Sequence, residues 1–169
     1  RFSFRPKGRF GLLLCAGYLL VLVTAHLFLG KLQQLIESTQ ALFSAEHFAF
    51  LLVIGLVVPI YEELFFLGSL FERMKPNFAN VGLQIYCNAL IFWMFHAPLQ
   101  FGTWLGALQQ YSLPFGPGPF LLGLVCATIA HKDLSIFWAI VFHGLANSLG
   151  PLWANIMTNE SIFQLFYSK

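Results

Sequence analysis

Long apolar runs separated by short polar joints make up most of the chain. Five runs are apolar almost throughout: about Phe10–Leu29, a run that begins near Phe48, about Val81–Leu99, about Pro119–Ala130, and Leu134 to about Met157. A helix of about 20 mostly apolar residues crosses the hydrocarbon core of a bilayer, and a helix screened by its neighbours needs fewer. The pattern therefore predicts an all-α fold, a polytopic transmembrane helix bundle with about five to six membrane helices.

The joints between the runs carry their own signals. Residues 31–47 place apolar side chains at helical spacing, which indicates a connector that lies in the membrane interface. Residues 100–118 contain paired Gly and Pro, so we expect an extramembrane or re-entrant loop there. Pro59 lacks a backbone donor and is expected to kink or break the second helix. With no internal repeat, residues 1–169 are predicted to form a single domain.

Composition supports a membrane location. Hydrophobic residues make up 58% of the chain, charged residues only 9%, and the mean hydropathy is +0.74. A soluble domain of this composition would have more apolar surface than it could cover. We therefore expect the lipid bilayer to be the main partner of this chain.

Basic residues predict the orientation. The net charge is only +2, and four basic residues precede the first apolar run, within residues 1–9. Placing this segment in the cytoplasm divides the basic residues about seven to two in favour of that side, as the positive-inside rule requires. The expected location is a bacterial inner membrane, with several passes and a cytoplasmic N-terminus. Such a distribution is a topology signal, and no nucleic-acid partner is expected.

The cysteines do not form a recognisable framework. Cys15, Cys87 and Cys126 all lie inside apolar runs, are odd in number and show no C-x-x-C spacing. This pattern argues against disulfide and structural zinc frameworks and predicts a packing role.

Two adjacent acids interrupt the second apolar run. Glu62 and Glu63 stand about midway along it, where a charged side chain costs about 2.5–3.5 kcal/mol on insertion scales. Solvation at a helix end beyond Tyr61 would be the simple alternative, but the apolar sequence LFFLGSLF follows the pair. Adjacent helical residues point about 100° apart, so the two carboxylates are expected to have different roles.

Two further polar pairs stand at helical spacing on later runs. His96 follows Phe92 by four residues, and Asn147 follows His143 by four, so each pair shares a helix face. Taken alone, His96 reads as a capping or interfacial residue, because Pro98 is expected to end its helix. His143 and Asn147 can donate towards one point, or can tie helices together by hydrogen bonds.

Read in order, the three motifs resemble the CAAX-protease and bacteriocin-processing (CPBP, Abi) family of intramembrane glutamic endopeptidases. The signatures of that family are EExxxR, FxxxH and HxxxN or HxxxD on successive membrane helices. The resemblance spans residues 59–150. Six residues match the signatures: Glu62, Glu63, Phe92, His96, His143 and Asn147.

One position departs from the family pattern. The arginine of the first signature would fall at residue 67, where this chain has Leu67. An arginine one turn beyond Glu63 would hold that carboxylate as an i,i+4 ion pair. In its absence, Glu63 needs a donor from another helix.

The resemblance implies an intramembrane endopeptidase that acts on a membrane-associated protein or peptide, with no metal or other cofactor. It casts Glu62 as the general base. We expect His96 to help Glu62 remove a proton from water, and His143 and Asn147 to donate hydrogen bonds to the developing oxyanion. Glu63 completes the predicted catalytic set. Prenylated C-termini, bacteriocin leaders and C-terminal sorting tails all fit as substrates.

Three other functions stay open. Two histidines and a carboxylate can form a catalytic zinc site, although no H-E-x-x-H ligand pair is present. With Leu67 in place of arginine, the chain can also be a catalytically degraded relative that acts as a bacteriocin-immunity or membrane scaffold protein. A proton-coupled carrier is the third reading, since membrane acids and histidines also form proton relays.

Overall fold

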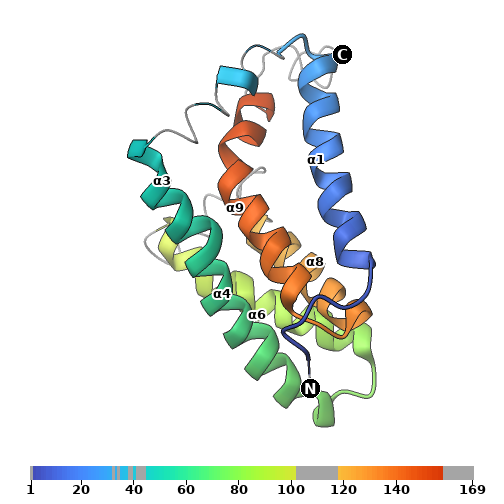
Figure 1. The fold of residues 1–169 in the computed structure, drawn as a ribbon. Helices are drawn as coiled ribbons and strands as arrows, with labels where there is room; N and C mark the ends of the chain where they lie inside the picture. The colour runs from blue at the N-terminus through green and yellow to red at the C-terminus, as the bar shows by residue number, and fades with distance from the viewer. Residues whose placement is uncertain are drawn as a thin grey trace, which may run out of the picture.

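The computed structural model describes six stretches of the chain: residues 2–31, 33, 35–37, 40, 45–101 and 118–157. Helices joined by short turns account for most of them (Figure 1). Within these stretches the only β-type pairing is an isolated bridge between Ser3 and Ser135. The predicted all-α helix bundle is thus confirmed.

Ten helical elements follow one another in the described part of the chain. They are α1 (Phe10–Phe28), α3 (Ala45–Leu52), η1 (Val53–Val57), α4 (Val58–Glu63), η2 (Leu64–Phe71), α5 (Glu72–Met74), η3 (Lys75–Asn77), α6 (Val81–Phe101), α8 (Gly118–Asp133) and α9 (Phe137–Met157). Elements η1 and η2 are π-helical and η3 is a 3₁₀-helix.

Two helical stretches within the described residues are long and apolar enough to cross a membrane. They are Phe10–Phe28 and Val53–Asn77, and Val81–His96 is a shorter apolar helix. The count of five to six spans stays a prediction. The loop expected at residues 100–118 falls almost entirely outside the described residues, as does much of the connector expected at residues 31–47.

The second apolar run forms one long helical rod, residues 45–77, which we call the glutamate helix. The break expected at Pro59 does not occur: α4 continues through it, and the helix widens into π-helical turns before and after α4. Proline removes one backbone donor, and a wider turn is one way for a helix to accommodate that loss.

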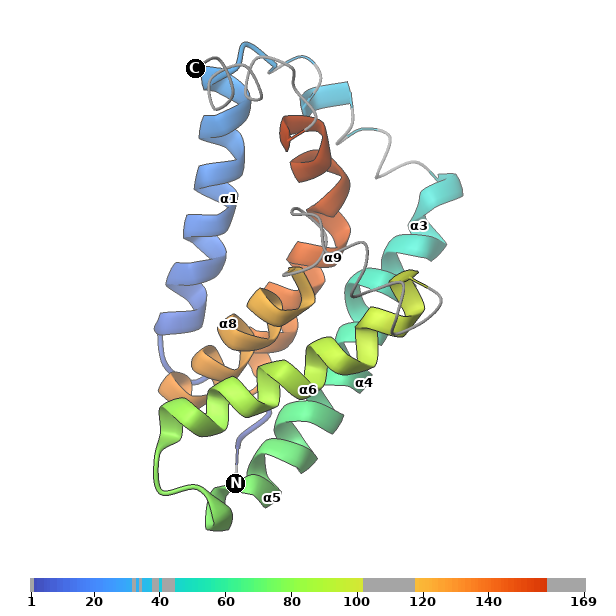
Figure 2. The same cartoon turned by 180° about the vertical axis from the view of Figure 1, so that it is seen from behind.

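The other helices pack around this rod. In Figure 2, α6 crosses the glutamate helix, α8 packs against α6, and α9 packs against α8. Helix α9 packs against η1 and α4 on one side and against α1 on the other. The helices with the predicted site residues, α4, α6 and α9, therefore meet in the interior.

Glycine allows α9 to approach the glutamate helix closely. A Cβ atom on Gly144 would overlap the carbonyl oxygen of Gly55, and a Cβ atom on Gly55 would overlap the Ser148 hydroxyl. Small residues at such crossings are typical of membrane helices. Gly144 follows His143 directly, so this contact also fixes the height of that histidine beside α4.

A carboxylate at the end of α8 caps α1. The polar sequence HKD at residues 131–133 is typical of a solvated turn, but α8 continues to Asp133, which is buried. Its two oxygens accept hydrogen bonds from the N–H groups of Phe10 at 3.1 Å and Gly11 at 2.8 Å. An anion at a helix N-terminus satisfies orphan donors and the helix dipole, which explains why this acid is buried.

Two other predicted helix ends differ from the structure. Helix α6 continues past Pro98 to Phe101, so the expectation that it closes directly behind His96 was wrong. Helix α9 begins at Phe137, because Ser135 and its neighbours pair with the N-terminal segment instead. Ser3 donates to Leu134 O at 3.1 Å, and Ile136 donates to Ser3 O at 3.0 Å.

Candidate active site

Three helices bring the predicted site residues together. Helix α4 supplies the two glutamates, α6 supplies His96, and α9 supplies His143 and Asn147. The two glutamates point to different partners, as their 100° separation predicts. These residues are far apart in the sequence, and they come together because α9 and α6 pack against the glutamate helix.

Glu62 lies between the two histidines. Its Oε2 is 3.3 Å from His96 Nε2 and 3.5 Å from His143 Nε2. The Glu62 side chain is 26% exposed and that of His143 only 2%. Glu62 is therefore the acid of the pair that a molecule entering from outside can reach.

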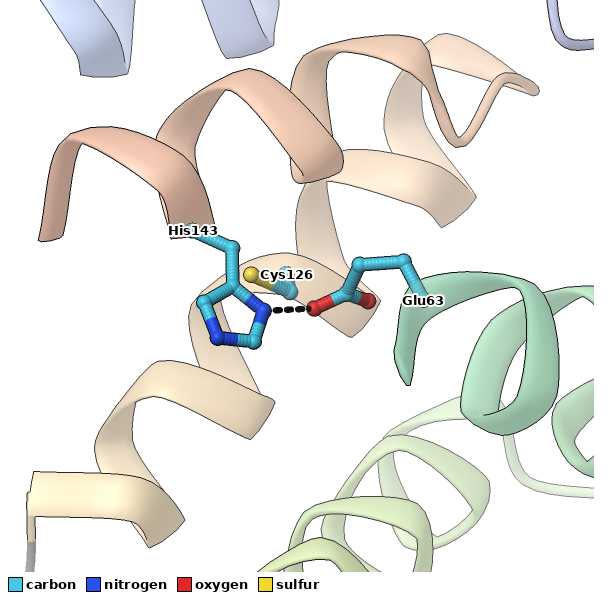
Figure 3. Close-up of side chains that lie close together, drawn as sticks. All are labelled: Glu63, Cys126 and His143. Atoms are coloured by element: carbon cyan, nitrogen blue, oxygen red, sulfur yellow. Dashed lines mark hydrogen bonds and ion pairs between the residues drawn. The ribbon is translucent and has the colours of Figure 1, made fainter. Parts of the chain in front are cut away.

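Glu63 is buried and bonded to His143 (Figure 3). Its Oε1 accepts a hydrogen bond of 2.7 Å from His143 Nδ1, and the two side chains are 1% and 2% exposed. Helix α9 thus supplies the donor that the absent arginine would have given.

Leu67, at the arginine position, is buried in the apolar core. It packs in one cluster with Phe71, Cys126 and Ile140. A side chain at this position faces packed apolar groups, which explains how leucine is accommodated there.

His96 is oriented by the residue one turn before it. Its Nδ1 donates to Phe92 O at 2.8 Å, and its ring stacks on the Phe92 ring with centroids 4.3 Å apart. A carbonyl only accepts hydrogen bonds, so Nδ1 carries a proton and Nε2 is the nitrogen directed at Glu62. The spacing F-x-x-x-H therefore fixes the rotamer of His96 and the nitrogen that it presents to Glu62.

The four ionisable groups form an alternating chain of acid and imidazole. In order they are Glu63, His143, Glu62 and His96, with each histidine contacting a carboxylate through a ring nitrogen. His143 has a carboxylate at each ring nitrogen, Glu63 at Nδ1 and Glu62 at Nε2. Such a chain can accept a proton at Glu62 and spread the resulting change in charge over its neighbours.

Asn147 has a structural bond as well as a place in the site. Its Nδ2 donates to Ile54 O, in η1, at 3.1 Å. This bond uses one of the two amide hydrogens, so one remains for another acceptor.

A cavity of about 490 Å³ opens beside these groups. Its lining includes Glu62, Phe92, His96, Leu122, His143 and Asn147. A second, more aromatic cleft of about 390 Å³ is lined by Tyr61, Phe65, Phe66 and Phe95 together with Glu62 and His96. The Glu62–His96 pair thus borders both hollows. The larger one also has polar side chains from α9 in its lining, whereas the smaller one is lined mainly by aromatic rings.

Sequence reasoning did not place Cys126 near the site. Ligand atoms of Glu63, Cys126 and His143 lie within 4.8 Å of one another (Figure 3). Carboxylate, thiolate and imidazole are zinc ligands, at about 2.0–2.3 Å from the metal. The 2.7 Å hydrogen bond between Glu63 and His143 is shorter than the roughly 3.3 Å between two ligands of a tetrahedral ion. A metal would therefore have to open this bond.

Comparison with known proteins adds independent information. A family model described as type II CAAX prenyl endopeptidase Rce1-like matches residues 43–149, which is more than half of the chain. The matched segment includes all five predicted site residues. Searches of curated proteins and of solved structures gave no match.

Proposed function

Because the chain belongs to the Rce1-like family of type II CAAX prenyl endopeptidases, a membrane-embedded family, we propose that it is an intramembrane endopeptidase that uses Glu62 to activate water. The observation that carries this proposal is the position of Glu62. Its carboxylate borders the cavity and has a histidine nitrogen on either side, at 3.3 Å and 3.5 Å. A carboxylate at such a place can act as a general base.

The first step is attack by water. A water held by Glu62 and His96 gives its proton to Glu62 as its oxygen bonds the scissile carbonyl carbon. The same proton then passes to the nitrogen of the departing amine, and the peptide C–N bond breaks. The Glu62 carboxylate is regenerated, so each turnover consumes one water and no other reagent.

Stabilisation of the oxyanion falls to α9. The second amide hydrogen of Asn147 is not used by the bond to Ile54, and His143 Nε2 is 3.5 Å from Glu62, beyond a good hydrogen bond. Both residues line the cavity. Once a substrate carbonyl enters, the Asn147 amide can donate to its oxygen as negative charge develops, and His143 can do so when both Nδ1 and Nε2 carry protons.

Glu63 acts through His143. Its carboxylate holds the Nδ1–H of the imidazole and so directs Nε2 towards the cavity. This arrangement is comparable to a carboxylate that orients a catalytic histidine by its distal nitrogen. Glu63 is therefore a positioning residue.

The proposed substrate is a membrane-associated peptide whose cysteine carries an isoprenoid chain near the C-terminus. The family description supports this class, and the aromatic cleft beside Glu62 and His96 offers an apolar surface for such a chain. The proposed location is a bacterial inner membrane with a cytoplasmic N-terminus. Bacteriocin leaders and C-terminal sorting tails are the alternative substrates.

A cleavage assay with three peptides tests this proposal. Purified protein in nanodiscs is mixed with a farnesylated CAAX-type peptide, its unprenylated copy and a leader-type peptide, and fragments are identified by mass spectrometry. We expect release of the C-terminal tripeptide from the farnesylated peptide alone. Glu62→Gln should abolish it, whereas Glu72→Gln, an acid on the same helix paired with Lys75, should not. Full cleavage by Glu62→Gln would refute the mechanism.

One observation favours a second function. Leu67 stands where the family signature has arginine, so the chain can be a non-catalytic relative that acts as an immunity or scaffold protein. In that case none of the peptides is cleaved by the wild type. Biological activity in the host would then survive Glu62→Gln and His96→Ala.

A further inference from the structure

Two π-helical segments flank the part of the glutamate helix that carries the two acids, and a proline follows each segment. In a π-helical turn the carbonyl of residue i accepts the N–H of residue i+5. Ile54 lies in η1 and Phe71 ends η2, and the residues five positions later are Pro59 and Pro76. Proline has no N–H. Neither carbonyl therefore has a backbone donor at residue i+5, although Phe71 is followed by the α-helical α5, where residue i+4, Lys75, has an N–H.

A side-chain amide from a neighbouring helix donates to each of these carbonyl oxygens. Asn147 Nδ2, on α9, donates to Ile54 O at 3.1 Å. Gln84 Nε2, on α6, donates to Phe71 O at 2.6 Å, and the Gln84 side chain is only 2% exposed. A buried amide without its acceptor would be costly, so this bond constrains the packing of the two helices.

The two donor helices are the ones that carry the two site histidines. Asn147 is one turn from His143, whereas Gln84 precedes His96 by twelve residues, about 18 Å along the axis of α6. Other contacts of α6 with the glutamate helix are between rings, such as Phe66 and Phe92 at 4.8 Å. Apolar contacts are not directional, while a hydrogen bond to a single carbonyl specifies one register.

We propose that Gln84 is a positioning residue of the proposed active site. Its bond to Phe71 O sets the register of α6 along the glutamate helix, and thereby the 3.3 Å distance between His96 and Glu62. Gln84 and Asn147 thus act as a pair of amide clamps, one for each histidine helix. The effect on cleavage rests on the proposed function, and the effect on His96 does not.

The expected effect is large because the His96–Glu62 contact has little tolerance. A shift of about 1 Å would lengthen the 3.3 Å separation of the two atoms beyond ion-pair distance, and a misplacement of that size costs about 10²-fold in rate. Gln84→Leu removes the donor with little change in volume. Gln84→Glu keeps a donor, because a buried carboxyl group stays protonated and its O–H can bond Phe71 O.

Asn88 provides a matched control one turn further along α6. It is 1% exposed, and among the described residues its Oδ1 has no hydrogen-bond partner. Asn88→Leu therefore removes an equally buried amide from the same helix, at an oxygen that accepts no hydrogen bond from the described residues. Any general effect of a more apolar α6 appears in both leucine variants.

Two readouts test the proposal in nanodiscs. Steady-state kinetics with the farnesylated peptide should show kcat lowered by about 10- to 100-fold in Gln84→Leu, with KM within about twofold. The ¹⁵N resonances of the His96 ring, assigned with His96→Gln, should show a changed titration in Gln84→Leu. Gln84→Glu and Asn88→Leu should match the wild type in both readouts.

The two readouts separate this proposal from the proposed function. If the wild type cleaves nothing, the His96 titration still decides the role of Gln84. An unchanged His96 titration in Gln84→Leu overturns the proposal, and so does an equal loss of kcat in Asn88→Leu. If Gln84→Leu does not fold, Gln84→Met is measured in its place under the same criteria.

Discussion

Replacing Glu63 by glutamine isolates the role of the buried acid. Glu63→Gln keeps the shape of the side chain and removes its charge, at a site where Oε1 lies 2.7 Å from His143 Nδ1 and both groups are almost fully buried. A hydrogen bond to a charged group contributes about 1.5–3 kcal/mol, against about 1 kcal/mol for a neutral pair. The expected loss is thus about 1–2 kcal/mol of transition-state stabilisation, or about 5- to 30-fold in kcat.

Peptide cleavage by the purified variant in nanodiscs measures this loss. Since Glu63 acts only through His143, the effect should disappear when His143 is already changed: Glu63→Gln should alter the residual rate of His143→Gln by less than about twofold. Glu72→Gln, at the far end of the same helix, serves as the control for a lost carboxylate. Wild-type kcat in Glu63→Gln, or full additivity of the two substitutions, would refute the reasoning.

Three further substitutions test the framework around the site. Asp133→Ala removes the cap of α1 and should lower the free energy of unfolding by about 1–2 kcal/mol, measured by thermal or denaturant unfolding. The kcat should stay unchanged, because the hydrogen bonds of the cap involve none of the site residues. Gly144→Ala should force α9 away from Gly55 and remove cleavage activity. Gly17 has open space around it, so Gly17→Ala should leave both activity and stability near wild type. Phe92→Leu keeps the carbonyl that orients His96 but removes the stacked ring, so kcat should fall by roughly tenfold. An unchanged kcat would show that the ring has no orienting role.

Which candidate site residues share a helix face could be predicted from the sequence, because this depends only on their spacing within one helix. Phe92 and His96 stand one helical turn apart and are bonded across that turn, whereas Asn147, one turn beyond His143, donates to Ile54 of the glutamate helix. The burial of Glu63 could also be anticipated from the apolar residues around it. Apolar run lengths gave the helical bundle for the same reason, since they report a local property of each segment.

Contacts between distant segments had no such signal. Asp133 looked like a residue of a solvated turn, because nothing near it in the sequence shows that the N-terminus of α1 lies against it. Cys126 looked like packing in an apolar run, and only the fold places it beside Glu63 and His143. The way in which the glutamate helix accommodates Pro59 also depends on a distant residue. Asn147, on α9 and ninety-three residues beyond Ile54, donates the hydrogen bond to Ile54 O that Pro59 cannot donate.

The central claim is that Glu62 activates the water that cleaves the peptide. The most direct measurement is the rate of tripeptide release from a farnesylated CAAX-type peptide by the wild type and by Glu62→Gln, purified side by side in nanodiscs and assayed in the presence of a chelator. The account predicts sustained release by the wild type and none above background by Glu62→Gln, with both proteins equally stable to heat. Equal release by the two proteins, or release by the wild type only after zinc is restored, would contradict it.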